Sequence, residues 1–418
     1  MRIGLLFILF IPITMVSASD LASDRPLTLE QAIIQVLEKN PLLKATDLEA
    51  QAAAARIRAA QLSPAFRASV ALENFAGNGT NKGDDNLETT LSLTKVLELG
   101  NKADARTRFT RQQAMLLGNH QDAQRLDLLA QSTKRFIYVI GQQERLKLMR
   151  DSLLLAQRTK KIILRRVRAG RSPNTELGRT NISLQRKKLD LKRVEYALEV
   201  SRLNLSSLWS ETIPRFHYAA GDLYKTSPLP PLNVLVEGLA QNPDLMALLS
   251  QQRLADMRVE LAQSKRSMDV EIAAGIRHFN ATDDSAFMLS LNLPLGTSSR
   301  AQVSIDEARS LQQREPYLYQ QKLLLLHTLL SELHKNIRYS IELITSLREQ
   351  IIPQAQLTLK DYERGYTAGR YSYLELTEAQ GVLLGARLEA IIAATDYHRY
   401  RIDMDRLTGA GLSTGVNP

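Results

Sequence analysis

The chain contains 418 residues with 44% hydrophobic side chains, a formal net charge of +10 and no cysteine. This apolar fraction excludes an intrinsically disordered chain, and the lack of cysteine excludes disulfides, thiolate catalysis and lipidation of an N-terminal cysteine. Lys and Arg are interleaved with Asp and Glu and form no groove-reading motif, so nucleic-acid binding is not expected.

Residues 1–18 have the pattern of a secretory signal peptide. Arg2 precedes the apolar run Ile3–Met15, and Val16-Ser17-Ala18 supplies the small residues of a cleavage site. The run is too short for a membrane anchor, and Pro12 interrupts it. We therefore predict an exported protein, with no later apolar run long enough for a transmembrane helix.

The remaining sequence contains one unit twice. Asn40-Pro41 corresponds to Asn242-Pro243, and Ala-Gly-Arg at 169–171 returns at 368–370. Each Ala-Gly-Arg is followed by Glu-Leu six residues after its glycine. This indicates an internal duplication of about 200 residues. We assign the first repeat to 19–224, a Pro-rich linker to 225–233, the second repeat to 234–411 and a flexible tail to 412–418.

Each repeat is expected to contain one β-hairpin, at about 66–97 and about 269–294, in which apolar and polar residues alternate. In the second repeat, for example, Ala274 and Ile276 alternate with Gly275 and Arg277. Membrane barrel strands show this pattern, with apolar side chains toward lipid and polar ones toward a lumen. Soluble hairpins alternate in the same way, so alternation alone does not separate the two. Because four strands cannot close a barrel, membrane strands would require several chains to share one.

Two long helical hairpins follow the strands, at about 101–209 and about 298–408. No proline occurs between Lys102 and Ala169, which allows roughly 100 Å of helix at ~1.5 Å per residue. In the second hairpin, Pro353 predicts a kink. Gly170 and Gly369 are expected to take the left-handed conformation that ends a helix. Spacings of 3, 4 and 7 predict coiled-coil seams, one of them formed by Leu326, Leu330, Leu333, Ile337, Ile344, Leu347 and Ile351.

Together these features resemble the TolC-type outer-membrane efflux channel family. The closest stretches are LTLEQA at 27–32, KNP at 39–41, and Tyr366 to Gly369 with LEL after it. LENFAGNG at 72–79 and VLELGNK at 96–102 are similar to the cobalt–zinc–cadmium heavy-metal branch. The resemblance implies a mainly α fold with a small β part. In it, a long antiparallel helical barrel continues a β-barrel to which each chain of a homotrimer gives four strands.

The family also implies a passive exit duct in the outer membrane of a Gram-negative-type bacterium, with its helical part in the periplasm. Such a duct contacts outer-membrane lipid and meets a proton-driven RND-type inner-membrane pump through a periplasmic adaptor. No cofactor is expected. No metal site is expected either, because the six histidines show no ligand spacing.

The resemblance places the periplasmic aperture just after the two helix turns. By position, Glu375, Glu378 and Glu176 would narrow the entrance, and rings of carboxylates favour cations. Tyr366 would hold the closed state, with Glu176 or Arg179 as its partner. The turns themselves, Gly170 with Arg171 and Gly369 with Arg370, would meet the adaptor. Without the resemblance, Glu375 and Glu378 would be ordinary solvated residues on a helix.

The sequence also bears on several alternative functions. An enzyme is not expected, because no nucleophile elbow, phosphate loop or His-Glu-x-x-His motif occurs. A soluble periplasmic coiled-coil adaptor or scaffold is the alternative from another class. Within the channel class, drug or solvent efflux and type I protein secretion remain alternatives to heavy-metal efflux.

Overall fold

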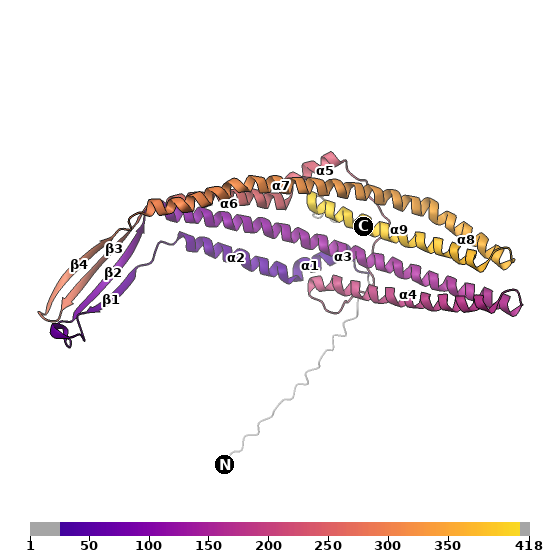
Figure 1. The fold of residues 1–418 in the computed structure, drawn as a ribbon, viewed down its shortest axis with the longest axis horizontal. Helices are drawn as coiled ribbons and strands as arrows, with labels where there is room; N and C mark the ends of the chain where they lie inside the picture. The colour runs from indigo at the N-terminus through magenta and orange to yellow at the C-terminus, as the bar shows by residue number, and fades with distance from the viewer. Residues whose placement is uncertain (1–25, 410–418) are drawn as a thin grey trace, which may run out of the picture.

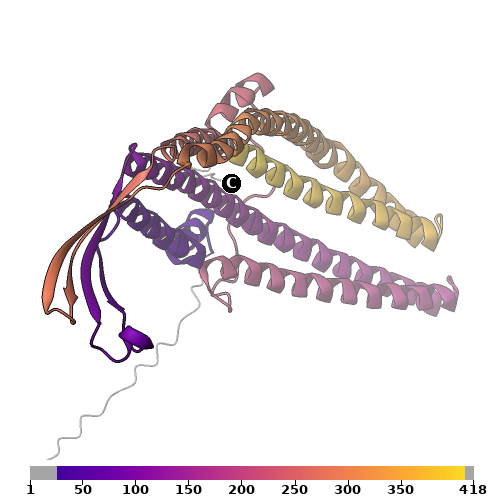
Figure 2. The ribbon, with the colours of Figure 1, turned by 60° about the vertical axis from the view of Figure 1, so that its left-hand side comes forward.

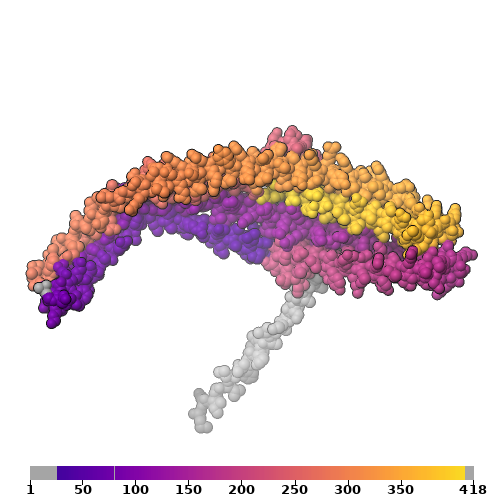
Figure 3. All heavy atoms as spheres, in the orientation of Figure 1, coloured from indigo at the N-terminus to yellow at the C-terminus, as the bar shows by residue number. Residues whose placement is uncertain are grey.

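The computed structural model describes residues 26–409, so the predicted signal peptide (1–18) and tail (412–418) lie outside the described residues. The described chain forms an elongated arch with a four-stranded sheet at one end and long helices that run to the other (Figures 1 and 3). None of the helices within 26–409 carries an apolar stretch sufficient to span a membrane.

Each repeat begins with two helices and continues with the predicted β-hairpin and long helical hairpin. The first consists of α1 (Leu29–Lys39), α2 (Pro41–Gln61), β1 (Arg67–Glu73), β2 (Glu88–Glu98), α3 (Lys102–Arg168) and α4 (Asn174–Ser206). The second consists of α5 (Leu232–Gly238), α6 (Pro243–Ser264), β3 (Asp269–Phe279), β4 (Asp284–Asn292), α7 (Thr297–Ser346), α8 (Ile352–Thr367) and α9 (Tyr373–Thr408). Helices α2 and α6 lie toward the sheet, and α4, α8 and α9 lie toward the opposite end (Figures 1 and 2).

The two Asn-Pro pairs show how closely the repeats correspond. Asn40 and Asn242 cap α2 and α6 with their side-chain oxygens, and the prolines that follow open these helices. The side-chain amides donate to main-chain oxygens near the ends of α4 and α9. Asn40 bonds to Leu208 and Asn242 to Leu407, each at 2.7 Å. Equivalent buried hydrogen bonds therefore join the start of each repeat to its end.

The sheet is an antiparallel meander in the order β1-β2-β3-β4, with β1 and β4 as its edges. Its register aligns Val70, Leu91, Ile276 and Phe287 across the four strands. Phe287 is 91% exposed and Val70 is 66% exposed, so this face presents apolar side chains to the surroundings of the chain. The predicted alternation is confirmed, and the apolar face requires a non-aqueous neighbour.

The opposite face of the sheet is polar and internally paired. Arg277 forms ion pairs with Glu73 at 3.1 Å and Glu88 at 2.9 Å. Gly275 lies on the same face, where an added Cβ would stand 2.4 Å from the main-chain oxygen of Leu91. The backbones of β2 and β3 therefore leave no room for a side chain at this position.

The seam predicted along α7 is buried as far as Leu347, and the structure corrects its last member. Ile351 is 43% exposed, whereas Leu347 is 2% exposed. A π-helical turn, Leu347–Ile351, separates α7 from α8 just before Pro353. Such a turn widens the helix by one residue, and the ring of Pro353 disfavours a regular turn before it. The extra residue rotates Ile351 out of the seam, so the irregularity precedes the proline.

A set of short elements packs against the long helices about halfway along the described structure (Figure 1). We call α1, α5 and the segment 210–231 the central layer. Its apolar side chains share one buried cluster with Phe136 and Ile140 of α3. Gln143 exchanges hydrogen bonds of 2.9 and 2.8 Å with the main chain of Ala219, and the N–H of Ser227 donates to the hydroxyl of Tyr397 at 2.8 Å. The central layer is thus attached to both α3 and α9.

The raised pKa of Asp405, near the end of α9, makes the stability of the fold depend on pH. Burial raises the pKa of Asp405 from 3.8 to about 6, and Arg401, 3.3 Å away, only partly opposes this rise. Because the folded chain binds this proton more tightly than the unfolded chain, the stability falls as pH rises from about 4 to about 6. The full loss corresponds to roughly 3 kcal/mol.

We therefore expect Asp405→Asn to raise the Tm at pH 7.5 and to change it little at pH 4. Thermal unfolding of both proteins in the same detergent at the two pH values measures this. An equal shift at both pH values would contradict the assignment, because it would show that ionisation of Asp405 is not what costs stability.

Candidate functional site at the tips of the long helices

The first helix of each hairpin ends in the same way, at the tip opposite the sheet. Gly170 and Gly369 have φ angles of +68° and +81°, the left-handed conformation that the sequence predicts. In each turn the glycine N–H bonds to the residue three before it at 3.0 Å, and the next N–H bonds to the residue five before it at 2.8 Å. This pair of bonds is a Schellman motif. It leaves Arg171 and Arg370 exposed at the two tips.

Tyr366 and Glu176 meet between the two hairpins. The hydroxyl of Tyr366 donates to Oε2 of Glu176 at 2.8 Å, which joins α8 to α4. Tyr366 is 1% exposed and belongs to an apolar cluster with Ile163 and Leu376. Burial raises the pKa of Tyr366, so its hydroxyl keeps its proton and remains a donor. Of the two partners that the sequence left open, Glu176 is the acceptor, and Arg179 is exposed.

Arg166 also joins the two hairpins, and the sequence did not single it out. Its guanidinium donates to the main-chain oxygens of Tyr366 at 2.5 Å and Thr367 at 3.1 Å in the second hairpin. In its own turn it donates to Oγ of Ser172 at 3.0 Å and to the main-chain oxygen of Arg171 at 3.2 Å. The guanidinium also stacks 4.7 Å from the ring centre of Tyr366. One side chain therefore fastens both turns together.

Comparison of the two repeats could have identified Arg166 as a residue with a distinct role. The residue 199 positions later (166 + 199) is Gly365, and the residue equivalent to Ser172 is Tyr371. A Cβ on Gly365 would stand 2.2 Å from the ring of Tyr371. The second turn thus places an aromatic ring against a glycine where the first turn places an arginine against a serine. This break in an otherwise repeated motif marks the residues that differ in role.

Glu375 has a local structural role at the start of α9. The N–H of Ser372 donates to Oε2 of Glu375 at 2.7 Å, and the N–H of Glu375 donates to Oγ of Ser372 at 3.3 Å. These reciprocal bonds form a capping box. The bond from the Ser372 backbone lowers the pKa of Glu375, with help from the Ser372 hydroxyl. Glu375 is therefore a fixed negative charge at the tip.

Glu378 lies about one turn after Glu375 on α9, and its side chain is exposed. Both carboxylates line a groove of about 540 Å³ together with Tyr362 of α8. Ile351, which the π-helical turn exposes, also lines this groove. The structure thus places the two acids on one surface, beside apolar side chains. Among the described residues, no group of three or more His, Cys, Asp and Glu side chains is arranged to hold a metal ion.

Comparison with known proteins finds similarity to efflux proteins over most of the chain. The model of the family described as outer membrane efflux protein matches residues 32–211 and 234–410, one segment in each repeat. The chain is 23% identical to the cobalt-zinc-cadmium resistance protein CzcC of Cupriavidus metallidurans over 386 residues, which cover 92% of this chain and 90% of CzcC.

Two solved structures illustrate the similarity in fold. A crystal structure of CusC matches with a TM-score of 0.77 and 18% identity, covering 92% of each chain. The open state of the MtrE outer membrane channel of Neisseria gonorrhoeae matches with a TM-score of 0.73 and 18% identity, covering 92% of this chain and 89% of MtrE.

The exposed apolar face of the sheet and the long helices are thus two parts of one channel architecture. The sheet lies in the outer membrane, and the helices extend into the periplasm. The chain therefore belongs to the outer membrane efflux protein family and serves as an outer-membrane channel for efflux.

Proposed function

We propose that three copies of this chain form the outer-membrane duct of a tripartite efflux system for heavy-metal cations. The duct is passive and catalyses no reaction, and the helix tips form its periplasmic aperture. The observation that carries this proposal is the open four-stranded sheet with one exposed apolar face. In lipid, the unpaired backbone groups of β1 and β4 must find partners, and in a ring of three copies β1 of one chain pairs with β4 of its neighbour.

The helical part supports the same assembly. Helix α4 exposes Ile182, Leu189 and Tyr196, which follow one another at spacings of seven residues. A seven-residue apolar spacing is typical of a seam that packs against another helix. Because α4 lies at the edge of the described chain in Figure 1, a helix of a neighbouring copy would cover this seam.

The substrate class rests on the relative CzcC and on the charge of the tip. CzcC is named for resistance to cobalt, zinc and cadmium. Three copies of Glu375 and Glu378 would surround the aperture with carboxylates, and such rings favour cations. The proposed lock of the closed aperture consists of Tyr366, Glu176 and Arg166, with Arg179 nearby on α4.

The proposed partners are a periplasmic adaptor and a proton-driven RND-type pump in the inner membrane. The adaptor would dock on Gly170, Arg171, Gly369 and Arg370, which are all exposed. The basic run 160–171 ends at the first of these turns and would attract an acidic adaptor surface. Charge for solubility alone explains the run equally well, so charge reversal in the adaptor is the informative test.

Replacing both aperture acids by glutamine is expected to lower the cation-over-anion permeability ratio roughly twofold or more. Glutamine is chosen because it keeps the capping box at Ser372. Single-channel recording of the Glu375→Gln, Glu378→Gln double variant in planar bilayers measures the ratio. Glu389→Gln, an exposed acid farther along α9, is the control. A ratio that stays at the wild-type value would remove both acids from the aperture.

The whole proposal is tested in a strain that lacks the gene and carries it back on a plasmid. Complementation is expected to restore growth on cobalt, zinc or cadmium salts. Restored tolerance to organic drugs or solvents, or restored export of a protein, would replace the heavy-metal proposal by one of those substrates. A protein that stays soluble and monomeric without detergent would instead identify a periplasmic scaffold and contradict the duct.

A further inference from the structure

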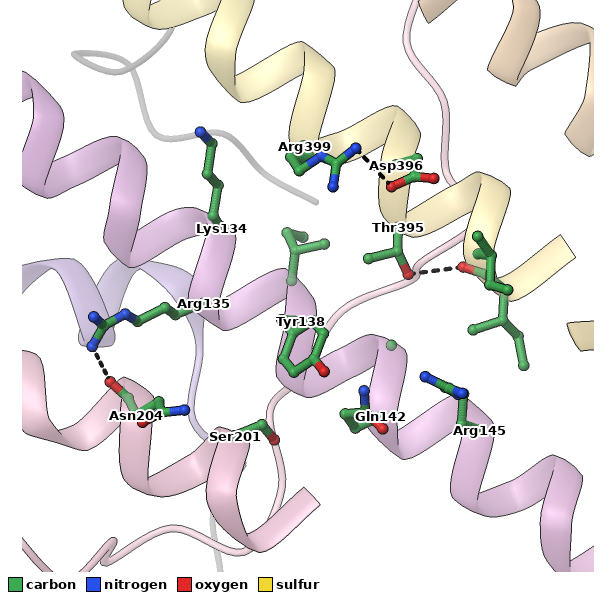
Figure 4. Close-up of a pocket in the computed structure, with 14 residues that line it drawn as sticks. Lys134, Arg135, Tyr138, Gln142, Arg145, Ser201, Asn204, Thr395, Asp396 and Arg399 are labelled. Carbon is green, nitrogen blue, oxygen red and sulfur yellow. Dashed lines mark hydrogen bonds and ion pairs between the residues drawn. The ribbon is translucent and has the colours of Figure 1, made fainter. Parts of the chain in front are cut away.

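A pocket of about 530 Å³ lies halfway along the helical part, far from both the sheet and the tips. Its walls come from α3, α4 and α9 of a single chain (Figure 4). Tyr138, Gln142 and Arg145 follow one another along α3, while Asp396 and Arg399 project from α9. Because one chain supplies every wall, the pocket does not depend on a neighbouring copy for its shape.

The pocket opens on the side of α3 and α9 that the central layer leaves uncovered. Gln143 and Tyr397 bond to the central layer. At about 100° per residue, Gln143 is roughly 140° around α3 from Tyr138, and Tyr397 is roughly 200° around α9 from Thr395. If the central layer faced the inside of the proposed trimer, it would fill the duct. The central layer therefore lies on the outer surface of the trimer. The pocket then faces the lumen, a placement that rests on the proposed function, although binding itself does not.

The lining is strongly cationic. Lys134, Arg135, Arg145 and Arg399 line the pocket, and Asp396 is the one acid among the lining residues. Asp396 is already paired with Arg399 at 3.2 Å, and Lys134 is paired with Asp403. Arg145 has no hydrogen-bond or ion-pair partner within residues 26–409, and its side chain is partly exposed. An uncompensated guanidinium in a concave site favours an oxyanion, which it can bind in bidentate fashion.

Gln142 supplies an independent observation. It is 2% exposed, and its side-chain oxygen is buried without a hydrogen-bond donor among the described residues. A buried acceptor without a donor is costly unless a ligand or water supplies one. Gly141 keeps α9 close at this point, since a Cβ there would stand 2.9 Å from the hydroxyl of Thr395. The pocket therefore offers a guanidinium for an anion and, beside it, an acceptor for a hydroxyl group.

We propose that this pocket binds a small oxyanion that also carries a hydroxyl group, such as a hydroxycarboxylate or a protonated phosphate. Arg145 binds the oxyanion, and the amide oxygen of Gln142 accepts from the hydroxyl. Arg135 is held by the main-chain oxygen of Asn204 and shapes the wall toward α4. In the proposed trimer, three such sites would form a level of positive charge between the acidic aperture and the membrane.

The test is isothermal titration of the full-length protein in mild detergent, at low ionic strength and without metal ions. The probes are citrate, tricarballylate, which has the same three carboxylates but no hydroxyl, and inorganic phosphate. Citrate is expected to bind once per chain and more tightly than tricarballylate. Arg145→Gln should weaken citrate binding about tenfold or more. Arg150→Gln, which removes the same charge from an exposed site on α3 outside the pocket, should leave it within about twofold.

A second variant tests the role of Gln142. Gln142→Leu should abolish the preference for citrate over tricarballylate and leave tricarballylate binding in place. Phosphate binding that exceeds citrate binding and depends on Arg145 would identify phosphate as the ligand. Wild-type protein that binds none of the probes at millimolar concentration would overturn the site. Equal losses in Arg145→Gln and Arg150→Gln would overturn it too, by showing diffuse attraction to surface charge.

Discussion

Replacing Arg166 by methionine is expected to raise the single-channel conductance of the assembled protein several-fold. Methionine keeps the aliphatic part of the side chain and removes the two hydrogen bonds to the second turn, together with the two that hold Arg166 in its own turn. A hydrogen bond to a charged group contributes about 1.5–3 kcal/mol, with exposed ones at or below the lower end. Because about 1.4 kcal/mol changes an equilibrium tenfold, even a fraction of this network is enough to shift the aperture from closed to open.

Arg165→Met is the matched control for this experiment. Arg165 stands beside Arg166 in the same basic run and is exposed, and within residues 26–409 its side chain bonds only to the main-chain oxygen of Lys161 in its own helix, at 3.4 Å. The Arg165→Met variant should leave conductance unchanged, while Tyr366→Phe, which removes the bond to Glu176 and leaves those of Arg166 in place, should give an intermediate increase. If Arg166→Met and Arg165→Met conduct alike, the effect is one of charge and the proposed fastening of the turns is wrong.

Gly275→Ala is expected to prevent most of the protein from assembling in the outer membrane. The new Cβ would meet the main-chain oxygen of Leu91 at 2.4 Å and Cβ of Ser92 at 3.0 Å. A backbone atom cannot rotate away, so β2 and β3 must separate and lose part of the pairing between the two repeats. A sheet that has lost this pairing leaves backbone groups unsatisfied in lipid, at several kcal/mol each.

The measurement is the amount of detergent-extracted assembly, by size-exclusion chromatography with light scattering. Gly118→Ala makes the same chemical change in the interior of α3, where a Cβ meets no atom within 4 Å. It should assemble normally or slightly better, because alanine favours a helix over glycine by about 1 kcal/mol. Normal assembly of Gly275→Ala would show that the strands can part here without cost.

Periodic features of this fold were predictable because the information for them is local. The alternation around Ala274 and Ile276 determines which face of a strand is apolar, and the register confirms the prediction. The left-handed glycines follow from the two Ala-Gly-Arg stretches in the same way. The displacement of Ile351 was not predictable, because the choice between a kink and a π-helical turn before Pro353 depends on packing against α9.

The sequence predicted the site only in outline, and its two residues Arg166 and Glu375 differ in how predictable they were. Arg166 stands in a run of chemically similar cations, and only the fold decides which of them reaches the other hairpin. Glu375, by contrast, had a readable local signal. Ser372-x-x-Glu375 is the pattern of a capping box, and the structure shows that cap. The roles of both residues at an aperture remain proposals that conductance decides.

The difference between Arg166 and Gly365 limits the symmetry of the periplasmic end. Three chains with two similar halves would present six helix hairpins around a ring, and the matching bonds of Asn40 and Asn242 show how alike the halves are elsewhere. At the tips the six positions alternate between two kinds, one held by an arginine and one by a tyrosine ring against a glycine. A partner with six identical subunits would therefore meet quasi-equivalent sites. It must bind both kinds with one flexible surface, or adopt two alternating conformations of its own.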